Sequence, residues 1–161
     1  MKKVPVLLLC VPLTFGPVVI ADDRTIGIGL GPLYGGFGMN LGLVNEERLR
    51  YLALGCVSAS YSSGTDDSEL DTNCGVAAGI VSSDPLPGQR HALGLSLGVT
   101  YQTDEDSGFG GGAELHVSPN YYFFFNGLGK SGFNLGIGPG LDLYEGGETE
   151  GDLRFNAGFQ F

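Results

Sequence analysis

The sequence predicts an all-β fold, an eight-stranded antiparallel up-and-down transmembrane β-barrel, from three observations. Gly contributes 29 of the 161 residues, well above the usual ~7 %, and each Gly inside a helix costs ~1 kcal/mol relative to Ala. Apolar residues recur at every second position, which is the period of a β-strand. The formal charge of −10 disfavours nucleic-acid partners, because Lys and Arg neutralise phosphates.

Residues 1–21 have the order of a cleaved secretory signal peptide. Lys2 and Lys3 precede an apolar run over 4–20, and Ala21 ends the segment, which fits a small-residue cleavage site. A membrane helix is the alternative, but the run is short for a span and prolines interrupt it. We expect residues 22–161 to form one barrel domain, whose charge is −12 once Lys2 and Lys3 are removed.

The alternation leaves each strand with one large apolar face and one small or polar face. Ile26, Ile28 and Leu30, for example, alternate with glycines. A soluble barrel of lipocalin type would expose those glycines, which weaken a strand without any gain at a solvent-facing site. If the apolar face meets lipid instead, the small residues fill the narrow lumen of an eight-stranded barrel. The glycine content therefore favours the membrane barrel.

Eight strands are predicted, an even number that fits a single-chain membrane barrel. They are expected near residues 24–31, 36–44, 49–61, 73–82, 90–103, 112–125, 132–144 and 152–161. The segment 45–54 also fits a helix, because Asn45 and Glu46 could cap an apolar stripe that ends before Gly55. A helix there would remove one strand and break the even count.

The connections between these strands divide by charge. Eleven of the 18 acidic residues lie in or beside three odd-numbered connections: Asp66, Asp67, Glu69, Asp71, Asp104, Glu105, Asp106, Glu145, Glu148, Glu150 and Asp152. The basic residues Arg24, Arg48, Arg50, Arg90 and Lys130 fall at the other strand ends. We expect an acidic end and a basic end of the barrel.

The last predicted strand carries a family resemblance. Phe155, Phe159 and the terminal Phe161 occupy alternate positions of an apolar face that begins at Leu153. With the signal peptide and the strand count, this pattern resembles the small eight-stranded outer-membrane β-barrel proteins of Gram-negative bacteria, some of which are porin-like. The resemblance covers the whole mature chain as a pattern and identifies no subfamily.

The resemblance implies a location and partners. Both termini would be periplasmic and the acidic connections extracellular, in a monomer surrounded by outer-membrane lipid and lipopolysaccharide. Phe155, Phe159 and Phe161 would be read by the barrel-assembly machinery, and divalent cations could bind at the acidic connections. The chain has no Trp, so the aromatic girdles of such barrels would be supplied by Tyr34, Tyr51, Tyr61, Tyr101, Tyr121 and Phe123–Phe125.

Two pairs of residues are expected to meet across hairpins. Cys56 and Cys74 are equidistant from residue 65, and export to an oxidising compartment favours a disulfide over two free thiols. Asp142 and Arg154 are equidistant from residue 148 and share the inward face. A lumenal ion pair between them is expected, because a charge in a narrow barrel needs a partner.

The most polar predicted strand carries Glu114, His116, Ser118 and Asn120 on one face. A hydrogen-bonded network in the lumen, with Asp142 and Arg154, is the favoured interpretation. The alternative is a lipid A acyl hydrolase, because His116 and Ser118 resemble the His and Ser of barrels that deacylate lipid A. Against this, such a site must face lipid, and residues two apart do not by themselves form a nucleophile–base pair.

The sequence therefore predicts a non-enzymatic outer-membrane protein with a structural or surface-interaction role and a side-chain-filled lumen. No cofactor is expected, because Gly27 and Gly29 lie in a strand rather than at the start of a helix. No Cys/His cluster has the spacing of metal ligands. A small pore is a further alternative, disfavoured because eight strands leave room only for side chains.

Overall fold

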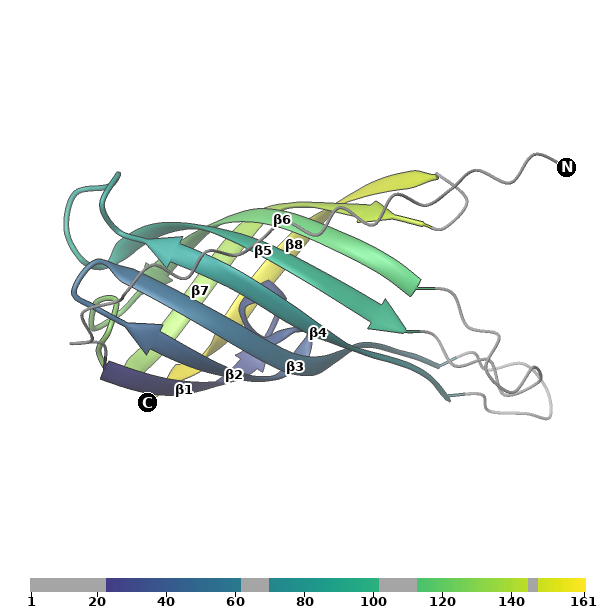
Figure 1. Cartoon of the computed structure of the whole chain (residues 1–161), viewed down its shortest axis with the longest axis horizontal. Helices are drawn as coiled ribbons and strands as arrows, with labels where there is room; N and C mark the ends of the chain where they lie inside the picture. The colour runs from purple at the N-terminus through teal and green to yellow at the C-terminus, as the bar shows by residue number, and fades with distance from the viewer. Residues whose placement is uncertain (1–22, 62–69, 102–112, 145–147) are drawn as a thin grey trace, which may run out of the picture.

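The computed structural model describes residues 23–61, 70–101, 113–144 and 148–161, and the predicted signal peptide lies outside them. Eight antiparallel strands pair in chain order and close into a barrel (Figure 1), as predicted. The strands are β1 (Asp23–Leu30), β2 (Phe37–Val44), β3 (Arg48–Tyr61), β4 (Leu70–Ser82), β5 (His91–Tyr101), β6 (Ala113–Phe124), β7 (Gly132–Leu143) and β8 (Thr149–Gln160). Because β3 begins at Arg48, the helix considered for 45–54 is wrong.

The barrel closes where β1 pairs with β8. Gly27 lies opposite Gln160 and Leu30 opposite Ala157, and the backbone N–H of Phe161 donates to the carbonyl oxygen of Ile26 at 2.8 Å. Figure 1 shows the C-terminus beside the start of β1. Closure leaves no free sheet edge along the paired strands, which removes the main route to edge-to-edge aggregation.

The two faces of the wall have opposite polarity. Large apolar side chains point outward on every strand, with Leu52, Phe37 and Phe155 between 66 % and 73 % exposed. Polar side chains fill the interior, where Asn40 and Asn134 are fully buried and Asn156 and Gln160 nearly so. In the described residues, no helix is long and apolar enough to span a membrane.

A short 3₁₀ helix, η1 (Pro32–Tyr34), connects β1 to β2 and folds into the lumen. Its turn begins at Gly31 and ends at Gly35 and Gly36, all with positive φ, a conformation that only glycine adopts without strain. Leu33 and Tyr34 are fully buried. We call the segment 31–36 the plug, because it crosses the interior of the barrel.

Glycines on two strands make room for the ring of Tyr34. A Cβ atom added at Gly29 or Gly158 would lie 2.6 Å or 2.4 Å from its ring atoms, well inside van der Waals contact. The small inner face predicted from the sequence thus accommodates an aromatic ring carried by the plug. Tyr51, Tyr122, Phe124 and Leu128 are also buried in the interior.

This arrangement corrects the aromatic assignment made from the sequence. Tyr34, Tyr51 and Phe124 are 0 %, 4 % and 2 % exposed and lie inside the barrel, so they belong to no outer girdle. Tyr51 and Phe124 share the inward parity of their strands, and Tyr34 is carried inward by the plug. Tyr121 and Phe125 do face outward, while the side chains of Tyr61 and Tyr101 lie outside the described residues.

Candidate functional site

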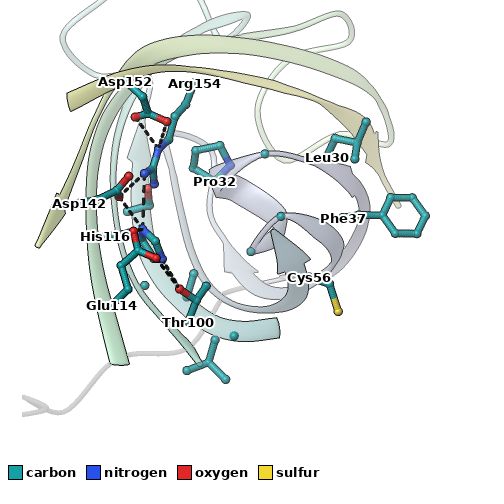
Figure 2. Close-up of a pocket in the computed structure, with 18 of the residues that line it drawn as sticks. Leu30, Pro32, Phe37, Cys56, Thr100, Glu114, His116, Asp142, Asp152 and Arg154 are labelled. Carbon is teal, nitrogen blue, oxygen red and sulfur yellow. Dashed lines mark hydrogen bonds and ion pairs between the residues drawn. The ribbon is translucent and has the colours of Figure 1, made fainter. Parts of the chain in front are cut away.

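An open cavity of about 760 Å³ lies in the barrel between the plug and the strand ends that lead into the acidic connections. Figure 2 shows one wall of it carrying a ladder of polar side chains, with Pro32 of the plug on the other side and Phe37 pointing away. The polar wall is formed by Thr100 of β5, Glu114 and His116 of β6, Asp142 of β7, and Asp152 and Arg154 of β8. We call these six residues the mouth cluster.

Strand register brings the first four members of the mouth cluster together. Thr100 lies opposite Glu114, and His116 lies opposite Asp142. The Thr100 hydroxyl is 2.6 Å from Nε2 of His116, and Nδ1 of His116 is 2.6 Å from Oδ1 of Asp142. The imidazole is thereby fixed between a hydroxyl and a carboxylate.

Arg154 joins the cluster from β8. Its guanidinium forms an ion pair with Asp142 and a second one with Asp152, at 2.9 Å from Nε to Oδ1. The predicted pairing with Asp142 is therefore present, but the predicted register is wrong. Arg154 lies opposite Gly138, and Asp142 lies opposite Glu150, so the hairpin centres on 146 and the long Arg side chain reaches along the sheet.

Ser118 and Asn120 lie deeper in the lumen, and their hydrogen bonds are to each other and to the backbone. The Ser118 hydroxyl donates to the carbonyl oxygen of Pro139 at 3.0 Å. Asn120 Nδ2 donates to the carbonyl oxygen of Ser118 at 2.9 Å and to its hydroxyl at 3.0 Å. His116 instead contacts Thr100, whose side chain is 4 % exposed. These contacts form a lumenal network of the kind expected from the inward parity.

Pro139 marks a local gap in the backbone ladder. β6 and β7 pair from Leu115 to Val117 and again from Tyr121, but not across Pro119 and Pro139. Proline has no N–H to donate, and the carbonyl oxygen of Pro139 accepts a hydrogen bond from the Ser118 hydroxyl. The side-chain network thus stabilises the wall where the backbone cannot.

The mouth cluster carries a negative charge. Three carboxylates, those of Glu114, Asp142 and Asp152, accompany one guanidinium. Just beyond β7, the Tyr144 hydroxyl donates a hydrogen bond to Oε2 of Glu150 at 3.4 Å. The nearby carboxylate of Glu114, more than that of Glu150, raises the pKa of Tyr144 to about 12. The cavity therefore favours cations over anions.

A second polar network holds the plug. Asn134 Nδ2 donates to the Tyr34 hydroxyl at 2.6 Å, and the N–H of Leu33 donates to Oδ1 of Asn156 at 3.2 Å. Asn40 Nδ2 donates to the carbonyl oxygen of Leu33 at 3.0 Å. Gln160 Nε2 in turn donates to Asn40 and to Thr25. These bonds join polar groups of the plug to side chains of three strands, β2, β7 and β8.

The remaining residues singled out from the sequence lie elsewhere. Cys56 and Cys74 are direct cross-strand neighbours and form a disulfide. His91 lies at the start of β5, with Nδ1 2.6 Å from the Tyr121 hydroxyl. Phe155 and Phe161 point outward, and the ring of Phe159 stacks against those of Phe133 and Phe161. Of the acidic residues in the connections, Asp66, Asp67, Glu69, Asp104, Glu105, Asp106 and Glu145 lie outside the described residues.

Three features of the site were not predicted from the sequence: Thr100, the place of Asp152 in the mouth cluster, and the plug. Thr100 shares the inward parity of β5, and a hairpin centred on 107 would have placed it opposite Glu114. Asp152 was assigned only to the acidic connections. The glycines flanking Pro32–Tyr34 signalled a turn, but nothing in the alternating pattern shows that the turn folds inward.

Comparisons with known proteins found no matching family model, no matching curated protein and no matching solved structure.

Proposed function

We propose that this chain is an outer-membrane β-barrel protein of a Gram-negative bacterium, with a non-enzymatic structural or surface-interaction role. The inverted polarity of the barrel wall carries this proposal. Leu41, Leu97 and Leu135, on three different strands, are each at least half exposed, whereas the lumen holds buried Asn, Gln and Ser. Exposed apolar area on this scale has no place in a soluble monomer and matches the lipid-facing band of a membrane barrel.

The filled lumen supports a closed barrel rather than a pore. The plug places Leu33 and Tyr34 across the interior, and Tyr51 and Tyr122 pack in the same core. The polar groups of the plug are bonded to the wall. An eight-stranded barrel leaves room only for side chains, and here the plug and those side chains occupy the lumen below the open cavity at its mouth.

The charge distribution supports the proposed orientation. The connections that follow β3, β5 and β7, together with the strand residues beside them, hold 11 of the 18 acidic residues, and the cavity opens toward the same end of the barrel. The opposite end carries Arg48, Arg90 and Lys130. Acidic connections facing the medium would meet cationic partners, or the divalent cations that bridge lipopolysaccharide, by charge complementarity.

Cell fractionation combined with gel mobility tests the location. The chain is expressed with its own N-terminal segment in a Gram-negative host, and the outer membrane is separated from periplasm and inner membrane. We expect the protein in the outer membrane, with an electrophoretic mobility in SDS that changes on boiling as the barrel unfolds. Recovery in the periplasm, with identical mobility before and after boiling, would establish the soluble alternative.

Mass spectrometry of lipid A tests the non-enzymatic assignment. Lipid A from cells with and without the chain is expected to be identical. Loss of an acyl chain that depends on the protein, and that His116→Ala abolishes while His91→Ala does not, would establish the lipid A acyl hydrolase instead. Single-channel recordings in planar bilayers, expected to show no conductance steps, test the pore.

A further inference from the structure

Three side chains of the mouth cluster combine the ligand types of a transition-metal site. Glu114, His116 and Asp142 each offer one ligand atom, and these three atoms lie within 4.8 Å of one another. Ligands of one tetrahedral ion with bonds of ~2.0–2.2 Å lie roughly 3–3.5 Å apart. Small side-chain rotations would therefore bring the three atoms around a single ion.

The composition of the set selects the class of ion. Imidazole nitrogen suits Zn²⁺, Cu²⁺, Ni²⁺ and related metals, whereas Mg²⁺ and Ca²⁺ prefer oxygen ligands alone. The acidic connections of this chain offer only carboxylates. A site that includes His116 is thus distinguishable by its chemistry from cation binding at the acidic rim.

The net charge of the mouth cluster and the free space beside His116 also favour the binding of one divalent metal ion. With a neutral His116, the carboxylates of Glu114, Asp142 and Asp152 exceed the single guanidinium of Arg154 by two negative charges, which one divalent ion would neutralise. Gly98 lies opposite His116 on β5, so no side chain from that position fills the space beside the imidazole. The cavity is open toward the strand ends, which gives a hydrated ion a route of entry.

Arg154 acts as the internal counterion in the structure described. It is paired with Asp142, but it also holds Asp152 through Nε, at 2.9 Å and 3.1 Å from the two carboxylate oxygens. Release of Asp142 to a metal would therefore leave Arg154 still paired. Nδ1 of the imidazole faces both carboxylates, at 2.6 Å from Asp142 and 3.9 Å from Glu114, while the other nitrogen, Nε2, lies 2.6 Å from the Thr100 hydroxyl. A hydrogen bond to the nitrogen that does not bind the ion commonly orients metal-ligating histidines.

We propose that Glu114, His116 and Asp142 form a binding site for one divalent transition-metal ion in the mouth of the barrel. When no metal is bound, the positive charge of Arg154 balances the carboxylate of Asp142. The site reaches beyond the proposed outer-membrane role and does not depend on it, because its ligands all belong to the barrel wall. Sequence spacing did not reveal it, since Asp142 lies on a different strand from Glu114 and His116.

Equilibrium dialysis of Zn²⁺ against the untagged barrel, folded in detergent and with excess Mg²⁺ to suppress binding at the acidic rim, tests the proposal. We expect one Zn²⁺ per chain, with affinity falling at least ~10-fold in Glu114→Gln and in His116→Gln. The chain has two histidines, so His91→Gln is the matched control and should bind as the native protein does. Mobility before and after boiling checks that each variant is folded, and Glu114→Gln serves if His116→Gln does not fold.

Two further results separate this site from adventitious binding. Arg154→Gln should tighten Zn²⁺ binding, because it removes a competing positive charge. The electron paramagnetic resonance spectrum of bound Cu²⁺ should show nitrogen coupling that His116→Gln removes and His91→Gln retains. Absence of one-to-one Zn²⁺ binding, equal effects of the two His variants, or weaker binding in Arg154→Gln would overturn the proposal.

Discussion

The Tyr34 hydroxyl accepts a hydrogen bond from Nδ2 of Asn134 at 2.6 Å, although the two residues are 100 positions apart in the chain. Tyr34 belongs to the plug and Asn134 to β7. Asn134 Oδ1 in turn accepts from Asn156 of β8 at 2.9 Å. This bonded row makes the plug an integral part of the barrel interior.

Truncation of Tyr34 should destabilise the barrel strongly. Tyr34→Ala removes a fully buried ring and leaves a cavity, for which we expect a loss of about 3–5 kcal/mol in the free energy of unfolding. Tyr34→Phe keeps the ring and leaves Asn134 with one donor unpaired, for an expected loss of about 1–3 kcal/mol. Urea unfolding of the barrel in detergent measures both, and equal losses would show that the ring is not packed as described.

Gly158 should be intolerant of a side chain because of Tyr34. A Cβ at this position would lie 2.4 Å from the Tyr34 ring and 2.5 Å from the backbone carbonyl oxygen of Ile28, so Gly158→Ala should lower the free energy of unfolding by about 1–3 kcal/mol, of which the Ile28 part should remain without the ring. Combined with Tyr34→Ala, its effect should shrink, since contacting residues are not additive. Gly151→Ala is the control, because a Cβ there meets its nearest atom at 3.8 Å. Additive effects of Gly158→Ala and Tyr34→Ala would contradict the packing.

The strands and their parity could be predicted from the sequence, because alternation has a period of two that local residues impose. Register was harder to predict. The hairpin of Cys56 and Cys74 was centred correctly, whereas that of Asp142 and Arg154 was misplaced by two residues because its centre was guessed from charge pairing. The plug could not be predicted, since its burial depends on the closure of the barrel, which brings Gly158 of β8 against the Tyr34 ring from far along the chain.

Only part of the candidate site could be predicted from the sequence, because the rest depends on the register between neighbouring strands. The inward parity of β6 correctly grouped Glu114, His116, Ser118 and Asn120. Their partners depend on the neighbouring strands, and there Thr100 rather than Ser118 meets His116. A pattern along one strand identifies a face, but the contacts across strands require the register of the whole barrel.

The disulfide should leave no free thiol in the processed protein. Cys10 lies in the predicted signal peptide, and Cys56 and Cys74 are bonded to each other. Thiol titration in denaturant should therefore find none before reduction and two after it. Cys56→Ser should lower the free energy of unfolding by up to about 3 kcal/mol, as expected for a loop closed over 18 residues. Two thiols reacting without reductant would contradict the bond.

An ion pair at the end opposite the acidic connections should make stability depend on pH. Asp84, in the β4–β5 turn, accepts a hydrogen bond from Nη2 of Arg48 at 2.8 Å. The side chains of Glu47, Arg48 and Ser82 lower the pKa of Asp84, while Asp84 raises the pKa of Glu47, so the net stabilisation comes from Arg48 and Ser82. A lowered folded-state pKa gives stability that is present above the ordinary Asp value of ~3.9 and is lost as the pH falls through the folded-state value. Asp84→Asn should therefore be less stable than the native protein at pH 7.

The difference between the native protein and Asp84→Asn should disappear in strong acid. Unfolding in urea at a series of pH values between 7 and ~2 measures it, and the exposed neighbour Glu46→Gln is the control. The effect is small because the pair is solvent-exposed. A difference that stays constant down to the lowest pH would mean that the Asp84 charge contributes nothing.

We propose that the apolar outer face of the barrel meets lipid and that the inner face does not. The chain has no Trp, so a single introduced Trp reports one position without background. Leu52 and Tyr51 are neighbours on β3, 69 % and 4 % exposed. We predict that, in vesicles with brominated acyl chains, the fluorescence of Leu52→Trp is strongly quenched and that of Tyr51→Trp is not. Equal quenching of the two, or no quenching of Leu52→Trp, would contradict the account.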